Sequence, residues 1–323
     1  MTEPRVLCMG EMLFDRLSDR PGLPLEQVDS WTDYPGGAPA NVACALVKLG
    51  TSAGFIGCIG KDEPGETLVN LLDEVGVDCT GVQRDDSAPT RIVYVVRDKA
   101  GDRSFAGFGD RAPTEFADTR LSADKLPIDL FKNAEYLVVG TLELAYPQSR
   151  QAVTKAIELA QQHNTRIFLD VNRRDMFWLN PGEALEPIRE LVKKVDFLKL
   201  TDEEAQWLFN TTDPTAIATE LGSKIKGVLV TAGEKGCWYW LAGNTGERAA
   251  FDVTVEDTTG AGDSFTAGIL HQLCQQGINC LDDAKTAQSI VEYATAVGAL
   301  TVMKPGAIAA QPKAENVAEF LKA

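Results

Sequence analysis

The sequence predicts an α/β fold, in which a doubly wound, mostly parallel sheet is flanked by helices and carries a small β-sheet lid. Three observations lead to this fold class. Short apolar runs alternate with amphipathic stretches along most of the 323 residues, two stretches break the alternation, and apolar residues make up 44% of the chain. A chain of this length fits one large unit with a small attachment, so we expect a single domain over residues 1–323.

The predicted strands are short and mostly apolar throughout, as strands buried on both faces should be. They cover residues 5–10, 52–57, 135–140, 166–171, 197–200 and 228–231. Between them lie stretches with helical periodicity, at residues 38–49, 65–75, 147–163, 185–195, 202–209, 262–276 and 282–300. Such alternation is typical of a parallel sheet with helices on both faces.

The lid is predicted from the two stretches without helical periodicity, residues 13–34 and 90–108. Residues 91–96 read as a strand, and residues 98–101 hold turn residues before a second extended piece at 102–108. We expect these pieces, within about residues 12–35 and 89–112, to form a separate sheet. Such a sheet would cover a site at the carboxyl ends of the main strands.

Charge and composition exclude several classes of function. The formal net charge of −16 disfavours binding to nucleic acid or to anionic membranes. No apolar run is long enough to span a bilayer, and the N-terminus lacks the pattern of a signal peptide, so we expect a cytoplasmic protein. The chain has only two histidines, His163 and His271, which favours a carboxylate as any general base.

The chemistry is predicted at residues 257–265, which read DTTGAGDSF and precede a clear helix. Residues 250–255 before this segment look like a strand. Gly260 and Gly262 remove side chains where the backbone turns into the helix, so bare amides at its N-terminus can hold an anion such as a transferring phosphoryl group. Asp263 in the first turn could accept the proton of an attacking hydroxyl. The alternative is a helix cap with an ordinary glycine turn.

A second glycine cluster, Gly36 and Gly37, precedes the helix predicted at 38–49. The two glycines allow the backbone to approach a ligand closely, and Asn41 offers the donor and acceptor groups that suit sugar hydroxyls. A plain structural turn is the alternative. Neither a P-loop nor the signatures of a protein kinase occur in the sequence.

Together the two segments resemble the signatures of the ribokinase/PfkB family of carbohydrate kinases. GGAPANVACALVKLG at residues 36–50 is similar to the N-terminal signature, and DTTGAGDSFTAGIL at 257–270 is similar to the C-terminal one. The resemblance extends through GEMLFD at 10–15, DVNRRDMFW at 170–178, VTAGEKG at 230–236 and GALTVMKPGA at 298–307. Two signatures in the expected order are far more specific than either alone, and the GEML opening is most similar to fructokinases.

The resemblance implies a role for each matching residue. Asp263 would be the catalytic base, and the amides of Gly260, Ala261 and Gly262 would form the anion hole. The implied sugar-binding residues are Asp15, Gly36, Gly37, Asn41, Arg91, Arg103, Glu143 and Arg174, and the implied nucleotide-binding residues are Thr231, Gly233, Gly236, Gly262 and Thr295.

The resemblance also implies metal sites. Glu204 would organise Mg²⁺ through water, although the asparagine that usually accompanies it is replaced by Thr201. A monovalent cation, K⁺, would be held near Asp257, Thr259, Thr301 and Gly306.

The implied activity is transfer of the γ-phosphoryl group of MgATP to a sugar hydroxyl, with D-fructose as the expected substrate. Ribose, 2-keto-3-deoxygluconate or a nucleoside is the alternative within the family. A catalytically silent regulatory relative is the alternative of another class, although intact Asp263 and GAG argue against it. Lid sheets in this family often pair, so we expect a homodimer.

Overall fold

The computed structural model describes residues 3–98 and 103–322. Its main sheet has nine strands in the order β13-β12-β11-β10-β9-β8-β1-β4-β5. All neighbouring strands are parallel except the pairs that include β12, so the predicted fold class is confirmed. The strand bounds are β1 Val6–Met9, β4 Ala53–Gly60, β5 Asp78–Asp85, β8 Tyr136–Val139, β9 Arg166–Asp170, β10 Phe197–Thr201, β11 Gly227–Thr231, β12 Cys237–Leu241 and β13 Asn244–Arg248.

The central strands are those that the apolar runs predict, because strands such as β1 and β8 are buried along their whole length. Three strands lie outside the predicted set. These are the two edge strands, β5 and β13, and β12, which pairs with β13; along all three, many side chains are partly exposed. Their patterns are therefore mixed or polar, and no continuous apolar run marks them.

Residues 250–255 are not a strand, contrary to expectation. The last strand ends at Arg248, and the chain then leaves the sheet on its way to the next helix. Phe251 packs against Phe320, with ring centroids 4.9 Å apart, whereas Val255 is 56% exposed. The segment thus has apolar residues with individual contacts and no neighbouring strand to pair with.

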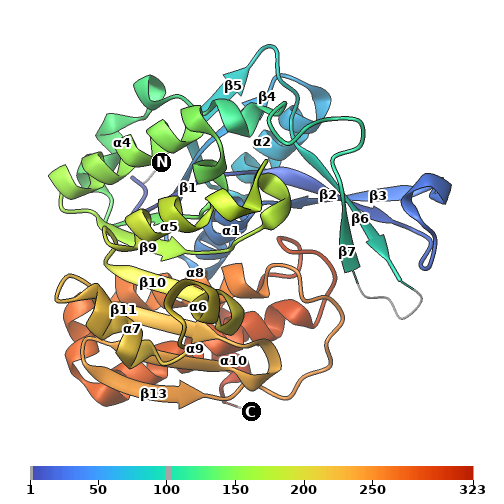
Figure 1. Cartoon of the computed structure of the whole chain (residues 1–323). Coiled ribbons are helices and arrows are strands. Elements are labelled where there is room, and N and C mark those ends of the chain that lie inside the picture. Colours follow the sequence, from blue (N-terminus) through green and yellow to red (C-terminus); the bar gives the residue numbers. More distant parts are fainter. Residues whose placement is uncertain (1–2, 99–102, 323) are drawn as a thin grey trace.

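Helices cover both faces of the sheet (Figure 1). One face packs against α1 Ala38–Leu49, α2 Glu63–Val75, α8 Ala261–Gln276, α9 Ala284–Val302 and α10 Ala314–Phe320, through side chains such as Leu46, Leu270 and Val291. The other face packs against α3 Ile128–Asn133, α4 Pro147–Gln162, α5 Leu185–Val192, α6 Asp202–Phe209 and α7 Pro214–Leu221. In the described part of the chain, every helix is too short or too polar to cross a bilayer.

The lid is a four-stranded sheet that projects from the body (Figure 1). Its strands, in the order β3-β2-β6-β7, are β2 Leu13–Ser18, β3 Trp31–Gly36, β6 Ile92–Arg97 and β7 Arg103–Gly107. The turn expected at 98–101 falls largely outside the described residues. Leu17, Val93 and Val95 share one face of the lid and pack with Phe108 in a small core of their own.

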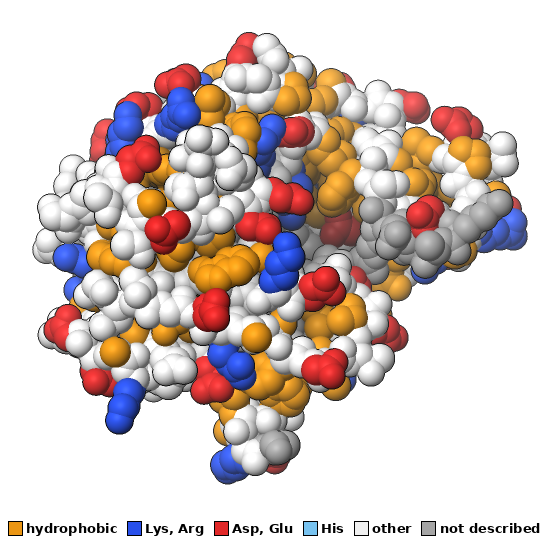
Figure 2. Space-filling model, turned by 60° about the horizontal axis from the view of Figure 1, so that its bottom comes forward, with side chains coloured by type: hydrophobic (Ala, Val, Ile, Leu, Met, Phe, Trp, Pro, Cys, Tyr) orange, Lys and Arg blue, Asp and Glu red, His pale blue; other side chains and the backbone are white. Residues whose placement is uncertain are grey.

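The winding of the chain fixes where a ligand can bind. From β1 the chain winds outward to β4 and β5, and it then returns to β8 and continues to the opposite edge. The direction therefore reverses between β1 and β8, and in open α/β sheets ligands bind at the carboxyl ends of such strands. Figure 2 shows a hollow where the lid meets the body.

Candidate active site

Two glycines shape the start of α8. Gly260, the residue before the helix, has a positive φ of 79°, and a Cβ there would lie 2.8 Å from Cβ of Ala307. A Cβ on Gly262 would lie 2.9 Å from the Nζ atom of Lys199. Gly260 thus needs to be glycine, whereas a side chain at 262 would have to displace the end of Lys199. The first turn of the helix presents amides that lack acceptors within the helix, and the amide of Ala261 donates to the Thr258 carbonyl at 3.3 Å. This cradle suits a phosphate group.

Asp263 in this first turn is joined to the other glycine segment. The side-chain amide of Asn41 donates a 2.7 Å hydrogen bond to its carboxylate, across 222 positions of sequence. Asn41 lies in the first turn of α1 and is buried, and its Oδ1 atom has no donor among the described residues. Because a buried amide oxygen without a donor is costly, this atom is suited to accept a hydrogen bond from a ligand hydroxyl.

The surroundings of Asp263 suit a general base. Loss of hydration and the nearby charge of Asp170 raise the pKa of the Asp263 carboxyl to about 6, against the lowering effects of Asn41, Lys199 and Arg174. A base works best when its pKa lies near the working pH. At neutral pH the carboxylate is ionised, yet it is much more basic than an ordinary aspartate.

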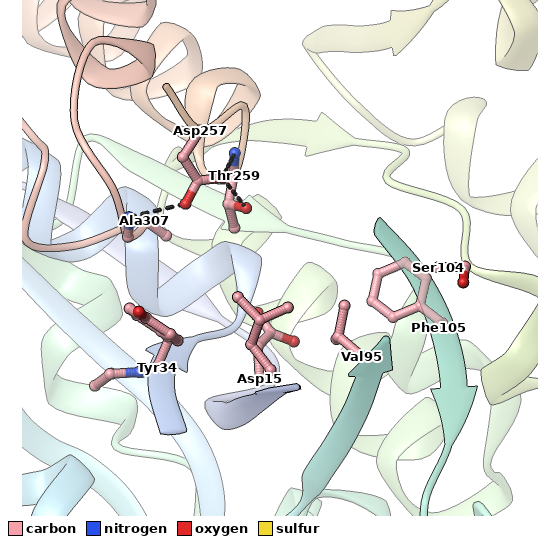
Figure 3. A pocket seen from close by; sticks show the side chains of 11 residues that line it. Asp15, Tyr34, Val95, Ser104, Phe105, Asp257, Thr259 and Ala307 are labelled. Atoms are coloured by element: carbon pink, nitrogen blue, oxygen red, sulfur yellow. Dashed lines mark hydrogen bonds between the residues drawn. The ribbon is translucent and has the colours of Figure 1, made fainter. Parts of the chain in front are cut away.

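Asp15, Gly36 and Gly37, which are predicted to bind the sugar, lie close together at the start of the lid. A Cβ on Gly36 would lie 2.9 Å from Oδ2 of Asp15, and one on Gly37, where φ is 107°, would lie 2.5 Å from the carbonyl oxygen of Glu11. Asp15 lines a pocket together with Tyr34 and the lid residues. In Figure 3, Asp15 and Tyr34 lie on one side of this pocket, and Asp257 and Thr259 lie on the other.

Asp257 connects the turn before α8 to the turn after α9. One carboxylate oxygen accepts the amide and hydroxyl of Thr259 at 3.0 and 2.7 Å, and the other accepts the amide of Gly306 at 2.9 Å. The hydroxyl of Thr301 forms hydrogen bonds with the hydroxyl of Ser264 and the carbonyl oxygen of Val297, both at 2.9 Å. These contacts join the two turns through hydrogen bonds donated to Asp257, and the role of Asp257, Thr259, Thr301 and Gly306 in holding K⁺ stays a prediction.

Glu204 is buried and holds two strand ends together. Its carboxylate accepts the amide of Thr201 at 2.8 Å in a capping box and the amide of Arg173 at 2.7 Å. No group of three or more histidine, cysteine or acidic residues that could hold a metal occurs among the described residues. The role of Glu204 in orienting the water shell of Mg²⁺ therefore stays a prediction.

Arg91 is not at the surface of the lid, where substrate contact was expected. Its side chain is only 1% exposed, and it forms two hydrogen bonds to Asp118 at 2.5 and 2.8 Å and another to the carbonyl of Pro113. Phe108, Phe116 and Phe177 surround the guanidinium. The side chain of Arg103 lies outside what the structure describes.

Glu143 is also buried, beside Gly10, and neither of its carboxylate oxygens has a partner among the described residues. Arg174 is exposed after β9, and its neighbour Arg173, rather than Arg174 itself, pairs with Asp175 at 2.6 Å. Glu143 follows the carboxyl end of β8 and Arg174 follows that of β9, both parallel strands of the main sheet.

The predicted nucleotide residues come from three places in the fold: the end of β11, the first turn of α8, which holds Gly262, and the interior of α9. Thr231 ends β11, and Gly233 and Gly236 lie in the turn that follows, with φ values of 54° and 98°. A Cβ on Gly236 would lie 2.0 Å from the carbonyl oxygen of Arg248. Chain packing alone therefore requires glycine at this position. Thr295 is buried in α9, and its hydroxyl donates to the Val291 carbonyl.

Two charged residues of the site were not predicted. Glu11 follows β1 and accepts the amide of Ala38 at 2.8 Å. Lys199 is buried in β10 beneath Gly262. A lysine inside the otherwise apolar run FLKL was the available signal for Lys199.

Comparison with known proteins agrees with this geometry. Residues 3–314 match the model of the pfkB family carbohydrate kinases. The chain is 35% identical to a probable fructokinase-3 of Arabidopsis thaliana, over 98% of this chain and 91% of that protein. Its structure is similar to that of a fructokinase from Xylella fastidiosa with bound ATP, with a TM-score of 0.88, 29% identity and 98% of each chain covered.

A further similar structure is a double mutant of the fructokinase from Vibrio cholerae O395 in a form with fructose, ADP and potassium ion bound. The TM-score is 0.85 and the identity 28%, over 99% of this chain and 98% of that one. The matching family model, the full-length relatives and the site at the start of α8 lead to one conclusion: the chain belongs to the PfkB family and is an ATP-dependent carbohydrate kinase.

Proposed function

We propose that this kinase phosphorylates D-fructose at O6. The observation that carries the proposal is the pair formed by Asp263 and Asn41, which joins the base at the phosphate cradle to the sugar-binding segment. The similarity over the full chain to plant and bacterial fructokinases supports fructose as the substrate. Asp15 and the free Oδ1 atom of Asn41 supply acceptors for its hydroxyls.

The transfer step is a displacement at phosphorus. The O6 oxygen of the sugar forms a bond to the γ-phosphorus while the bond from that phosphorus to the β,γ-bridging oxygen breaks. The hydroxyl proton goes to the carboxylate of Asp263, and ADP carries away the bonding electron pair. The amides at Gly260, Ala261 and Gly262 face the negative charge of the transferring group, where preorganised donors contribute most.

Residues of β11 and the following turn, of α6 and of α9 with its following turn are assigned to the nucleotide and its ions. Thr231, Gly233 and Thr295 would hold ATP, and Glu204 would orient the water shell of Mg²⁺, which neutralises phosphate charge when bound. Asp257, with backbone near Thr301 and Gly306, would hold K⁺ behind the anion hole. We expect faster turnover in K⁺ than in Na⁺ buffer, and equal rates would remove the potassium assignment.

A sugar panel tests the proposed substrate. Purified protein, MgATP and one sugar at a time are combined, and ADP release is followed. We expect the highest kcat/KM with D-fructose, while a higher value with ribose, 2-keto-3-deoxygluconate or a nucleoside would replace fructose as the substrate. Failure of every acceptor would support the catalytically silent alternative.

The Asp263→Asn variant tests the assigned base. Because asparagine cannot take the proton, we expect turnover to fall by a factor of ~10² or more with little change in sugar affinity. Turnover close to that of the unmodified enzyme would end the assignment.

The expected homodimer and cytoplasmic location remain predictions. Light scattering on the purified protein gives the mass in solution and checks the first. A monomer at working concentration would contradict pairing through the lid.

A further inference from the structure

A buried lysine lies directly under the anion hole. Lys199 is the third residue of β10, between β9 and β11, and its side chain is 7% exposed. Every other residue of that strand except the terminal Thr201 is apolar and buried. Placing an ammonium group in such a position costs several kcal/mol of hydration, so the fold must gain something from it.

Asp170 holds the ammonium in place. The Nζ atom of Lys199 lies 3.0 and 2.9 Å from the two carboxylate oxygens of Asp170, its register neighbour on β9. The hydroxyl of Thr266, one turn into α8, donates a 3.0 Å bond to the same carboxylate. Although burial opposes the charged form of Lys199, the attraction of Asp170 prevails, and the pKa of the ammonium lies above its ordinary value.

The position of this charge is unusual for a structural ion pair. The Nζ atom lies 2.9 Å from where a Cβ on Gly262 would be, so the ammonium abuts the N-terminal turn of α8. That end of a helix already carries partial positive charge, which repels a cation. Asp170, Glu204 and Asp263 compensate the ammonium within the fold, and on the side of Gly262 the ammonium and the helix N-terminus present positive charge to the same spot.

We propose that Lys199 is a positioning residue for phosphoryl transfer, held by Asp170 under the first turn of α8 so that its charge adds to the amides that hold the γ-phosphoryl group. The proposal rests on the assigned role of the Gly260–Gly262 amides, but not on fructose as the acceptor. It also explains why residue 262 is glycine, since a larger residue would displace the ammonium. Asp170, Glu204 and Asp263 are the acidic groups that act on Lys199.

The first measurement compares two nucleotides. Kd is measured by calorimetry for MgADP and for a non-hydrolysable MgATP analogue. The values for the unmodified enzyme are compared with those for the double variant Lys199→Met with Asp170→Asn. This variant removes both buried charges together, so that neither is left unpaired. We expect analogue affinity to fall about tenfold while ADP affinity hardly changes, because only the analogue has a γ-phosphate. An equal change for both nucleotides would overturn the proposal.

The second measurement is kinetic, with whichever sugar the unmodified enzyme phosphorylates best. We expect kcat of the double variant to fall by ~10²-fold, comparable to loss of one preorganised donor, with the sugar KM nearly constant. If Lys199 only neutralised Asp170, the double variant would have the same urea midpoint and the same kcat as the unmodified enzyme. Values of the urea midpoint and kcat equal to those of the unmodified enzyme would therefore refute a role of Lys199 in phosphoryl transfer.

A matched control separates charge from mechanical support. Thr266→Val removes the hydrogen bond between α8 and Asp170 but leaves both charges in place. We expect this variant to keep the affinity difference between the analogue and ADP. Loss of that difference in Thr266→Val would instead assign the effect to the tie between α8 and the sheet. If the sugar panel shows that the enzyme phosphorylates another sugar and not fructose, these tests of Lys199 keep their meaning.

Discussion

At the residue scale, the chemistry depends on how the protein adjusts one carboxyl group. Loss of hydration and Asp170 raise the pKa of Asp263, and Asn41, Lys199 and Arg174 lower it, with the result near 6. The carboxylate is then ionised at neutral pH but basic enough to take a proton in the transition state. In the proposed mechanism Asn41 links this balance to sugar binding, because the side chain that contacts Asp263 also has an oxygen without a donor.

We predict an acid limb in the pH profile of kcat/KM. The base must be ionised to act, so activity should be full above about pH 7 and should fall about tenfold per unit below pH 6. Initial rates between pH 5 and 8, with enzyme stability checked at each value, measure the limb. A flat profile down to pH 5 would contradict the role of Asp263.

Substitution of Asn41 should move that limb. Its hydrogen bond favours the ionised form of Asp263, so Asn41→Ala should shift the limb to higher pH, and Asn41→Asp, which adds a like charge, should shift it further. The order of the three midpoints is the measured result. A limb that stays in place in both variants would show that another group titrates.

At the element scale, the lid is joined to the body by a buried ion pair. Arg91, just before β6, reaches Asp118 in the segment Ala117–Arg120, and both side chains are at most 2% exposed. Three aromatic rings lie 4.5 to 5.0 Å from the guanidinium carbon. The pair links the base of the lid to the body, and substrate contact by Arg91 stays a prediction.

We predict that Arg91→Met destabilises the protein by about 3–5 kcal/mol, because Asp118 would be left buried without its partner. Urea unfolding measures the loss. The double variant with Asp118→Asn should recover part of it, and Lys132→Met, in an exposed pair with Asp129, should leave the midpoint unchanged. A loss below about 1 kcal/mol, as for a surface pair, would contradict this role.

At the scale of the whole molecule, two acidic groups meet where β1, β8 and the lid come together. Burial raises the pKa of Glu11 to about 7, and burial together with the charge of Glu11 raises that of Glu143 well above its ordinary value. Between pH 4.5 and about 7 the folded state therefore holds protons that the unfolded chain has released. Folding stability should fall as the pH rises through this range.

The Glu143→Gln variant tests this account. Glutamine has the same shape but no charge, so the variant should have a higher urea midpoint than the unmodified protein at pH 8, and the difference should shrink towards pH 5. Glu203→Gln, at an exposed position of α6, is the control and should change neither value. A constant difference across the range would exclude proton uptake by Glu143 as the cause.

The sequence by itself determined the layered fold and the two ends of the site. Apolar runs such as VLCM and YLVV identify central strands because both faces of those strands are buried. The glycines at 260 and 262 and the acid at 263 indicate the cradle, because glycine permits the positive φ at 260 and leaves positions 260 and 262 without side chains. Edge strands such as β13 were missed because half of their side chains face water.

Only the tertiary structure decided which residues act together. Asn41 and Asp263 lie 222 positions apart, and Lys199 reaches the cradle from a strand that sequence alone treats as core. The structure also shows that Arg91 is buried in an ion pair with Asp118, which no local sequence pattern indicates. The physical reason is that charge interactions and burial depend on distance through space, whereas a sequence pattern reports only the geometry of neighbouring residues.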